Sequence, residues 1–467
     1  MTRGNIRHAD VEVRIISATG VCGSGFKESS LEAGLARKPH FIGCDAGSTD
    51  PGPFSLGSGK SAFPVRSVKR DLQLMLKAAR REKIPLLIGS AGTAGGAPHL
   101  ATFKKIVLEI AEEQKLSFRL ALIDSEQSKN YLKERLGQGR ITPLKHAPHF
   151  DNDVIDRAER IVAMMGTEPY MRALADGADV VIAGRSSDCA IFAGIPVDLG
   201  VAPGTAWHAA KILECGAAAA TARPSPDSIF ATLGSDYFDI EPLDPELRCT
   251  PQSVAAHALY ENSDPYHLVE SSGVLNLTNA HYEALDDRSV RVRGSSFEHS
   301  AKYTVKLEGA ELVGYESIVI GSIRDPYIIR QLDSWIERLK QKVNARTAEV
   351  FSGQNGPGDY TFNIRIYGKN GTMGPLEPVK EIRSQEVCLV MEVTAKTQEQ
   401  ATTIISLARH QALHLPIPDW DGFITTLACI YSPAYLERGA VYRFCVNHVV
   451  EPEDPYEMFP IEYMNLG

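Results

Sequence analysis

A glycine-rich stretch directly after an apolar run is the feature that most constrains how this chain folds. Residues 85–99 read PLLIGSAGTAGGAPH, and four of the eight residues from 89 to 96 are glycine. The pattern predicts a buried strand, a tight loop and a helix over residues 100–115. Backbone N–H groups in such a loop can converge on an anion, and the helix start adds its dipole. A strand-to-helix turn that binds nothing is the alternative reading of a single loop of this kind.

Short apolar runs alternate with amphipathic segments through the first half of the chain. The apolar runs predict strands, and apolar residues at helical spacing predict helices between them. This alternation is typical of an α/β fold with a parallel sheet and helices on both faces. The strands that matter most for a site are expected at residues 40–44, 85–88, 118–123 and 179–183.

The pattern changes after about residue 224, where β-like segments separated by turn signals replace the alternation. We expect an α/β core over residues 1–345 that includes an antiparallel, β-rich part at about 224–325. Within that part, residues 302–307 and 316–321 are expected to form two strands. A linker at 346–360 and a small α+β domain at 361–467 complete the expected organisation.

Composition excludes several classes of function. The formal net charge is −9, which argues against binding to nucleic acid or to an anionic membrane surface. No apolar stretch approaches the roughly 20 residues that span a bilayer, and the first residues lack an apolar signal segment. The eight cysteines form no CxxC pair, as in a reducing compartment. We therefore expect a cytoplasmic protein, and a homo-oligomer is the default for an enzyme of this size.

Four polar clusters follow predicted strands of the core. The carboxyl ends of parallel strands lie along one edge of a sheet, where ligands bind in α/β folds. Each cluster alone would suit turn or capping chemistry, but four together favour a site. The candidate catalytic residues are Asp45, Asp50, Asp124 and Asp188, and the candidate substrate-binding residues are Ser48, Gly89, Ser90, Ala91, Gly92, Thr93, Gly95, Gly96, Arg185, Ser186 and Ser187.

The chemistry of these residue types suggests their roles. The glycine loop and Arg185 would hold a carboxylate or phosphate, with Arg185 making a two-pronged contact. The aspartates would supply a general base and acid, because crowded carboxylates raise one another's pKa. The same carboxylates would also suit Mg²⁺ or a similar hard cation, and the sequence does not separate the two uses. A nicotinamide cofactor is not expected, because Gly20, Gly23 and Gly25 do not have the order of a dinucleotide fingerprint.

Two further groups carry weaker indications. His146 and His149 lie in a loop with Asp151 and Asp153, but their spacing matches no standard zinc motif. Cys215 would be a nucleophile if a base approached it, although a buried structural cysteine is the commoner case.

Several of these motifs resemble the acyclic terpene utilisation (AtuA) family. The resemblance spans nearly the whole chain and is carried by residues 43–50 (GCDAGSTD), 88–96 (IGSAGTAGG), 184–188 (GRSSD), 213–217 (LECGA), 432–433, 439–444 and 448–450. It implies an AtuA core followed by a ferredoxin-like C-terminal domain. It also implies a cytosolic catabolic enzyme that handles acyl-CoA thioesters or small carboxylic acids.

Residues and resemblance together favour a lyase of the hydratase or dehydratase type. Its substrate would be a carboxylate or an acyl-CoA, from which an aspartate moves the proton alpha to the carbonyl. A thioester hydrolase or a carbon–carbon lyase would use the same groups. A subunit that binds an acyl ligand for a partner enzyme, without catalysis, is the alternative from another class.

Overall fold

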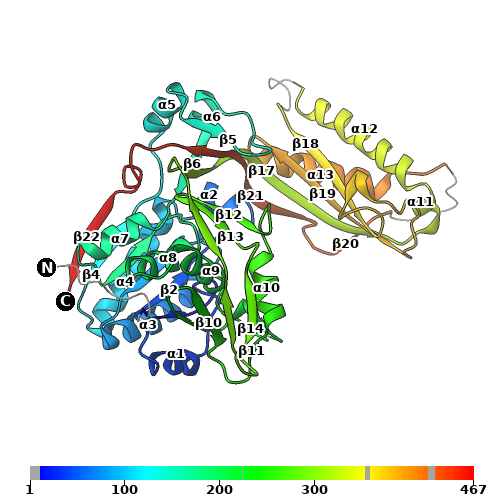
Figure 1. Cartoon of the computed structure of the whole chain (residues 1–467). Coiled ribbons are helices and arrows are strands. Elements are labelled where there is room, and N and C mark those ends of the chain that lie inside the picture. Colours follow the sequence, from blue (N-terminus) through cyan, green and yellow to red (C-terminus); the bar gives the residue numbers. More distant parts are fainter. Residues whose placement is uncertain (1–10, 223, 353–357, 419–425) are drawn as a thin grey trace. The chain divides into compact units, whose positions relative to one another are not determined.

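The computed structural model describes residues 11–222, 224–352, 358–418 and 426–467 (Figure 1). The chain forms two compact units, one of residues up to Glu311 together with Phe444–Gly467, the other of Leu312–Arg443. These limits differ from the boundaries expected at 345 and 361. The chain leaves the first unit within one strand and returns to it within another. Of the expected linker, residues 353–357 lie outside the described residues, and 346–350 belong to a helix of the second unit.

A ten-stranded sheet forms the centre of the first unit, in the order β14-β15-β10-β9-β1-β2-β3-β7-β4-β22. Its five middle strands pair in parallel: β1 (Val13–Ser17), β2 (Phe41–Asp45), β3 (Leu86–Gly89), β7 (Val180–Ala183) and β4 (Phe118–Ile123). The others pair antiparallel: β9 (Ile229–Leu233), β10 (Tyr237–Pro242), β15 (Val290–Arg293), β14 (His281–Ala284) and β22 (Ile461–Leu466). The unit therefore has a mixed α/β architecture, because its central sheet contains both parallel and antiparallel strand pairs. In Figure 1 the red strand β22 lies beside β4.

Neighbouring residues of the middle strands are buried in two different cores, one on each face of the sheet. Ile15 and Val181 belong to one apolar cluster, and Ile16 and Ile182 to the other. Strands buried on both faces need nearly continuous apolar runs. One face is covered by α1 (Glu28–Leu35), α3 (Val65–Glu82) and α4 (Ala97–Gln114). The other is covered by α7 (Glu168–Ala175), α8 (Ala190–Asp198) and α9 (Pro203–Leu213).

Several short elements complete the first unit. Among them, β12 (His267–Glu270), β13 (Gly273–Asn276) and β16 (Ser296–His299) form a three-stranded antiparallel sheet, and β8 (Ala220–Thr221) pairs with β11 (Arg248–Cys249). The remaining elements are α2 (Phe54–Ser58), α5 (Lys129–Gly137), β5 (Ile141–Pro143), α6 (Asn152–Arg157), β6 (Ala158–Met164), the 3-10 turn Gly216–Ala219 and α10 (Pro251–Leu259).

The two strands expected at 302–307 and 316–321 are one continuous strand, β17 (Val305–Ile323). Its first part pairs with β6, and Gly309 on this part allows Val446 to pack closely, because a Cβ there would lie 2.5 Å from Val446. Gly309 therefore marks a close contact and not a turn. The strand β21 runs from Tyr435 to Val450.

In the second unit, the rest of β17 pairs with β19 (Val387–Ala395), which pairs with β18 (Thr361–Tyr367). The helices α12 (Leu332–Val350) and α13 (Gln398–His414) pack with these strands around a separate apolar core that contains Trp335. The unit also contains α11 (Pro326–Arg330), the 3-10 turn Gly374–Leu376 and β20 (Ala428–Cys429). An α+β arrangement was expected here, and the ferredoxin-like topology stays a prediction. None of the helices in the described parts is long and apolar enough to cross a membrane.

Candidate active site

A polar cavity of about 510 Å³ lies at the carboxyl ends of β2 and β7, in the first unit. Residues that follow these strands meet there with side chains from α9, β12 and β17. The charged side chains that line it are the acids Asp50, Asp188, Glu214, Glu261 and Glu270 and the bases Arg185, Lys211 and Lys306. Acidic and basic side chains that line the same cavity can bind a polar ligand and transfer protons to or from it.

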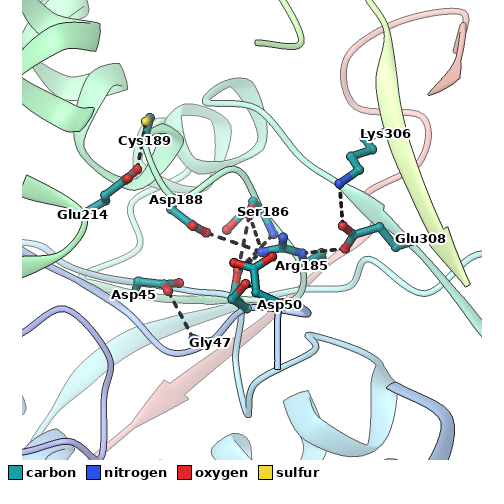
Figure 2. Close-up of polar contacts among 12 residues, drawn as sticks. Asp45, Gly47, Asp50, Arg185, Ser186, Asp188, Cys189, Glu214, Lys306 and Glu308 are labelled. Atoms are coloured by element: carbon teal, nitrogen blue, oxygen red, sulfur yellow. Dashed lines mark hydrogen bonds and ion pairs between the residues drawn. The ribbon is translucent and has the colours of Figure 1, made fainter. Parts of the chain in front are cut away.

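Arg185, directly after β7, is held by several acceptors (Figure 2). Its Nε donates to Oε2 of Glu308 at 2.9 Å, and its Nη1 lies 3.1 Å from Oγ of Ser90. The same Nη1 is 3.2 Å from the carbonyl oxygen of Ser186 and 3.4 Å from Oδ1 of Asp188. The side chain is therefore fixed in position, and Nη2 takes part in none of these bonds.

Glu308 joins two of the cavity's bases. One carboxylate oxygen accepts from Arg185, and the other accepts from Nζ of Lys306 at 2.8 Å. Burial by itself would raise the pKa of Glu308, but the charges of Arg185 and then Lys306 outweigh it and lower the pKa to about 2. Glu308 is therefore ionised at neutral pH, and the cluster of Arg185, Lys306 and Glu308 carries a net positive charge.

Two acids in the lining hold their protons near neutral pH. Burial raises the pKa of Asp188 to about 7, with Arg185 opposing the rise and Glu214 adding to it. Burial likewise raises the pKa of Glu270 to about 8, against a hydrogen bond from Ser187 and with the help of the charges of Glu214 and Asp188. Such carboxyl groups can act as general acid and base at physiological pH.

Asp45, the last residue of β2, is a third buried carboxyl with a raised pKa, and it is not in the described lining of the cavity. Its Oδ2 accepts from the backbone N–H of Gly47 at 3.3 Å, and its buried Oδ1 has no partner among the described residues. Burial, and then the charge of Asp188, raise the pKa of Asp45 well above its usual value.

Lys211 and Glu214 form a buried ion pair within the lining. Nζ of Lys211 lies 2.5 Å from Oε1 of Glu214, and the thiol of Cys189 donates to Oε2 of Glu214 at 3.0 Å. Burial and then the charge of Glu214 raise the pKa of Cys189 well above its usual value, so the group is a thiol and a poor nucleophile. Cys215 is outside the described lining, and burial raises the pKa of its thiol as well.

The glycine-rich loop packs against other parts of the chain. The N–H groups of Ser90, Ala91, Thr93 and Gly95 donate to backbone carbonyls, so these four amides do not face a ligand. A Cβ on Gly95 would lie 2.1 Å from the backbone nitrogen of Arg185. The close approach of Gly95 lets the loop pack against Arg185, and the four occupied amides are not available to the anion cradle that was expected.

The N-terminus of α4 is capped by a carboxylate from the same chain. The N–H of Ala97 donates to Oε2 of Glu126 at 2.8 Å, where a ligand anion was expected from the sequence. Glu126 comes from the loop after β4 and satisfies a helix N-terminus that would otherwise lack an acceptor.

The structure divides the predicted site residues into three groups. Ser48, Asp50, Arg185, Ser187 and Asp188 line the cavity. Residues that are buried but absent from the described lining are Asp45, Ser90, Ser186 and the loop residues Gly89, Ala91, Gly92, Thr93, Gly95 and Gly96. Asp124 is not in the described lining, and its Oδ1 accepts from the N–H groups of Ser125 and Glu126, which is turn chemistry.

Sequence reasoning missed Lys211, Glu214, Glu270, Lys306 and Glu308 as site residues. A signal was present for the first two, because charged residues at i and i+3 stand out in the small, apolar sequence of α9. No local pattern marks Glu270 or Glu308, which come from antiparallel strands.

The two histidines weighed as metal ligands do not form a cluster with other ligating groups. His149 pairs with Asp151 at 2.8 Å in an exposed loop. Across the described residues, no group of three or more His, Cys, Asp or Glu side chains is placed to hold a metal ion.

The comparison with protein families identifies the chain's relatives. The model of the acyclic terpene utilisation family protein AtuA matches residues 60–222 and 244–425. The chain belongs to the AtuA family. In this AtuA-family protein the matched residues include Arg185, Asp188, Lys211, Glu270 and Lys306, whereas β2 and the loop after it precede the match. No curated protein and no solved structure matches the chain.

Proposed function

We propose that this AtuA-family protein is a catabolic lyase of the hydratase or dehydratase type, acting on a small carboxylic acid or an acyl-CoA thioester. The observation that carries the proposal is the pair Asp188 and Glu270. Both carboxyls titrate near neutral pH and line one cavity with Arg185 and Lys211.

In the direction of dehydration, Asp188 in its ionised form takes the proton alpha to the substrate carbonyl. Glu270 in its protonated form gives its proton to the departing hydroxyl, so that water leaves and a carbon–carbon double bond forms. Arg185 and Lys211 stabilise the negative charge that develops on the substrate oxygen. Hydration follows the same steps in reverse.

The alternatives use the same cavity. A thioester hydrolase with a cysteine nucleophile is disfavoured, because the raised pKa of Cys189 keeps it as a thiol. A thioester hydrolase that uses the carboxylates, a carbon–carbon lyase and a non-catalytic binding subunit stay open as outcomes of the test. A cytoplasmic homo-oligomer is part of the same proposal.

The test measures turnover and binding with the purified protein. Short hydroxy acids, enoic acids and enoyl-CoA thioesters are offered, and products are identified by mass spectrometry in ordinary and heavy-oxygen water. Asp188→Asn and Glu270→Gln are expected to lower turnover by about 100-fold or more while ligand affinity persists. The matched control is Glu298→Gln on strand β16 of the same three-stranded sheet as Glu270, an exposed residue outside the described lining.

Three results would contradict the proposal. The first is a product other than that of adding water to, or removing it from, a carbon–carbon bond. Free acid with coenzyme A indicates thioester hydrolysis, and two carbon fragments indicate carbon–carbon cleavage. The second is full activity in both carboxyl variants. The third is tight binding of a ligand that is never converted, which indicates a binding subunit.

A further inference from the structure

One side of the cavity carries two bases, Arg185 and Lys306, that would suit a single anionic group. Arg185 and Lys306 both line the cavity, and each donates to a different oxygen of Glu308. Figure 2 shows the three side chains side by side, with Glu308 bridging the two bases. Glu308 neutralises one of the two positive charges, and Asp188, 3.4 Å from Nη1 of Arg185, balances the other when it is ionised. When Asp188 is protonated, the cluster has a net charge that one carboxylate of a ligand would balance.

The rest of the lining is polar. The apolar side chains in the described lining are Met164, Leu268 and Val269, and Val269 is 78% exposed, so it offers little enclosed apolar surface. Hydroxyl and amide groups face the cavity between the charged residues, from Ser48, Ser187, Asn262 and Ser263. Ligand pockets are usually lined mainly by apolar side chains, so a polar lining selects a polar ligand.

A hydrocarbon chain would bind weakly against these walls. Burying it here would remove water from charged and hydroxyl groups without giving them new hydrogen bonds, which is unfavourable. The volume of about 510 Å³ has room for a molecule of few carbons, and the polarity of the walls, not the volume, is what selects against a hydrocarbon chain. A hydroxyl on such a molecule would instead find donors and acceptors on several sides.

We infer that the cavity takes a short, hydroxylated free carboxylic acid, with its carboxylate against Arg185 and Lys306, and not a terpenoid acid or a CoA thioester. The inference rests on the proposed function for the reaction, but the binding that it describes does not depend on turnover. The proposed function allows a small carboxylic acid or an acyl-CoA thioester as substrate, and the inference selects the small carboxylic acid.

Calorimetric binding to the full chain tests the inference. The probes are 3-hydroxybutyrate, its methyl ester, citronellate as a branched apolar acid, and crotonyl-CoA. We expect 3-hydroxybutyrate to bind at least about tenfold more tightly than each of the others, because its carboxylate keeps charge-assisted bonds that the ester lacks. Equal or tighter binding of citronellate, of crotonyl-CoA or of the ester would overturn the inference.

Two lysine variants locate the carboxylate. Lys306→Met is expected to weaken binding of 3-hydroxybutyrate by about tenfold, through loss of one charged donor. Lys302→Met is the matched control, since Lys302 is 69% exposed and pairs with Glu451 outside the cavity. Thermal unfolding of both variants shows whether Lys306→Met is folded. If it is not, Lys306→Gln and Lys306→Arg replace it, and unchanged affinity in a folded variant overturns the placement.

The outcome separates this inference from the proposed function. Conversion of crotonyl-CoA without binding of the short acid would support the lyase and refute the substrate class. Selective binding of the short acid, with dependence on Lys306 but no conversion of any hydroxy or enoic acid, would support the substrate class and refute the lyase.

Discussion

The guanidinium of Arg185 donates from Nε to Oε2 of Glu308 over 2.9 Å, although 123 positions separate the two residues in the chain. Both side chains are almost fully buried, at 4% and 5% exposure. The loop after β7 supplies the base, and β17 supplies the acid. This pair therefore ties the edge of the central sheet to the strand that carries Lys306, and it places two of the cavity's bases.

Removing the acid of this pair should destabilise the protein. We expect Glu308→Gln to lower the free energy of unfolding by about 3 kcal/mol, because a buried charge loses its partner. The control is Asp156→Asn, which removes the exposed partner of Lys133 and should cost less than about 1 kcal/mol. Urea unfolding measures both. Equal small losses would show that Glu308 is not needed to hold Arg185.

The raised pKa of Glu270 predicts how stability depends on pH. In the unfolded chain this carboxyl titrates near 4.5, and in the folded protein its pKa is about 8. Between these values the folded state binds the proton and the unfolded state does not, so stability falls as pH rises. We expect the urea midpoint to decline from about pH 5 to about pH 8, and Glu270→Gln to reduce the decline. Glu298→Gln should leave the slope as it is, and an unchanged slope in Glu270→Gln would contradict the assignment.

Gly95 and Gly139 have nearly the same φ angle but differ in how closely other atoms approach them. Substituting each in turn therefore separates the cost of backbone strain from the cost of close packing. Gly95 has φ +67° and its Cβ would meet the nitrogen of Arg185 at 2.1 Å, whereas Gly139 has φ +68° and nothing within 4 Å. Gly139→Ala should cost about 1 kcal/mol, the strain of a left-handed conformation. Gly95→Ala should cost clearly more, since the loop must also move away from Arg185, and it should weaken ligand binding. Equal losses in urea unfolding would mean that the contact is unimportant.

The chemistry of Cys189 gives a prediction about thiol labelling. Because its pKa is raised and its thiol is 4% exposed, iodoacetamide at neutral pH should leave Cys189 unmodified in the folded protein. Digestion and mass spectrometry after labelling would show this. The same reagent should modify Cys189 after unfolding in urea, which serves as the control. Rapid labelling in the folded state would revive a nucleophilic role.

Local patterns predicted many elements well. The apolar runs before residues 45, 89, 124 and 184 correspond to β2, β3, β4 and β7, and the helix predicted at 100–115 corresponds to α4. These segments are predictable because burial on both faces, or on one helical face, leaves a direct trace in residue spacing. After β4, Asp124 and the next residues form a turn, and α5 begins only at Lys129.

Longer-range contacts decided what local patterns could not. The interval between the strands expected at 302–307 and 316–321 contains Gly309, whose missing side chain makes room for Val446, far along the chain. The glycine-rich loop was expected to form an anion cradle, but four of its amides donate to backbone carbonyls of this chain. In both cases the partner of the segment was not visible in the sequence.

The sequence by itself determined the alternating core, the loops that follow its strands, and the family to which the chain belongs. It also pointed to Arg185 and Asp188. Only the tertiary structure decided that Lys211, Glu270 and Lys306 join them in one cavity, and that Asp124 does not. The physical reason is that strand and helix patterns arise from neighbours along the chain, whereas a carboxyl acquires its pKa, and an arginine its partner, from residues brought close by packing.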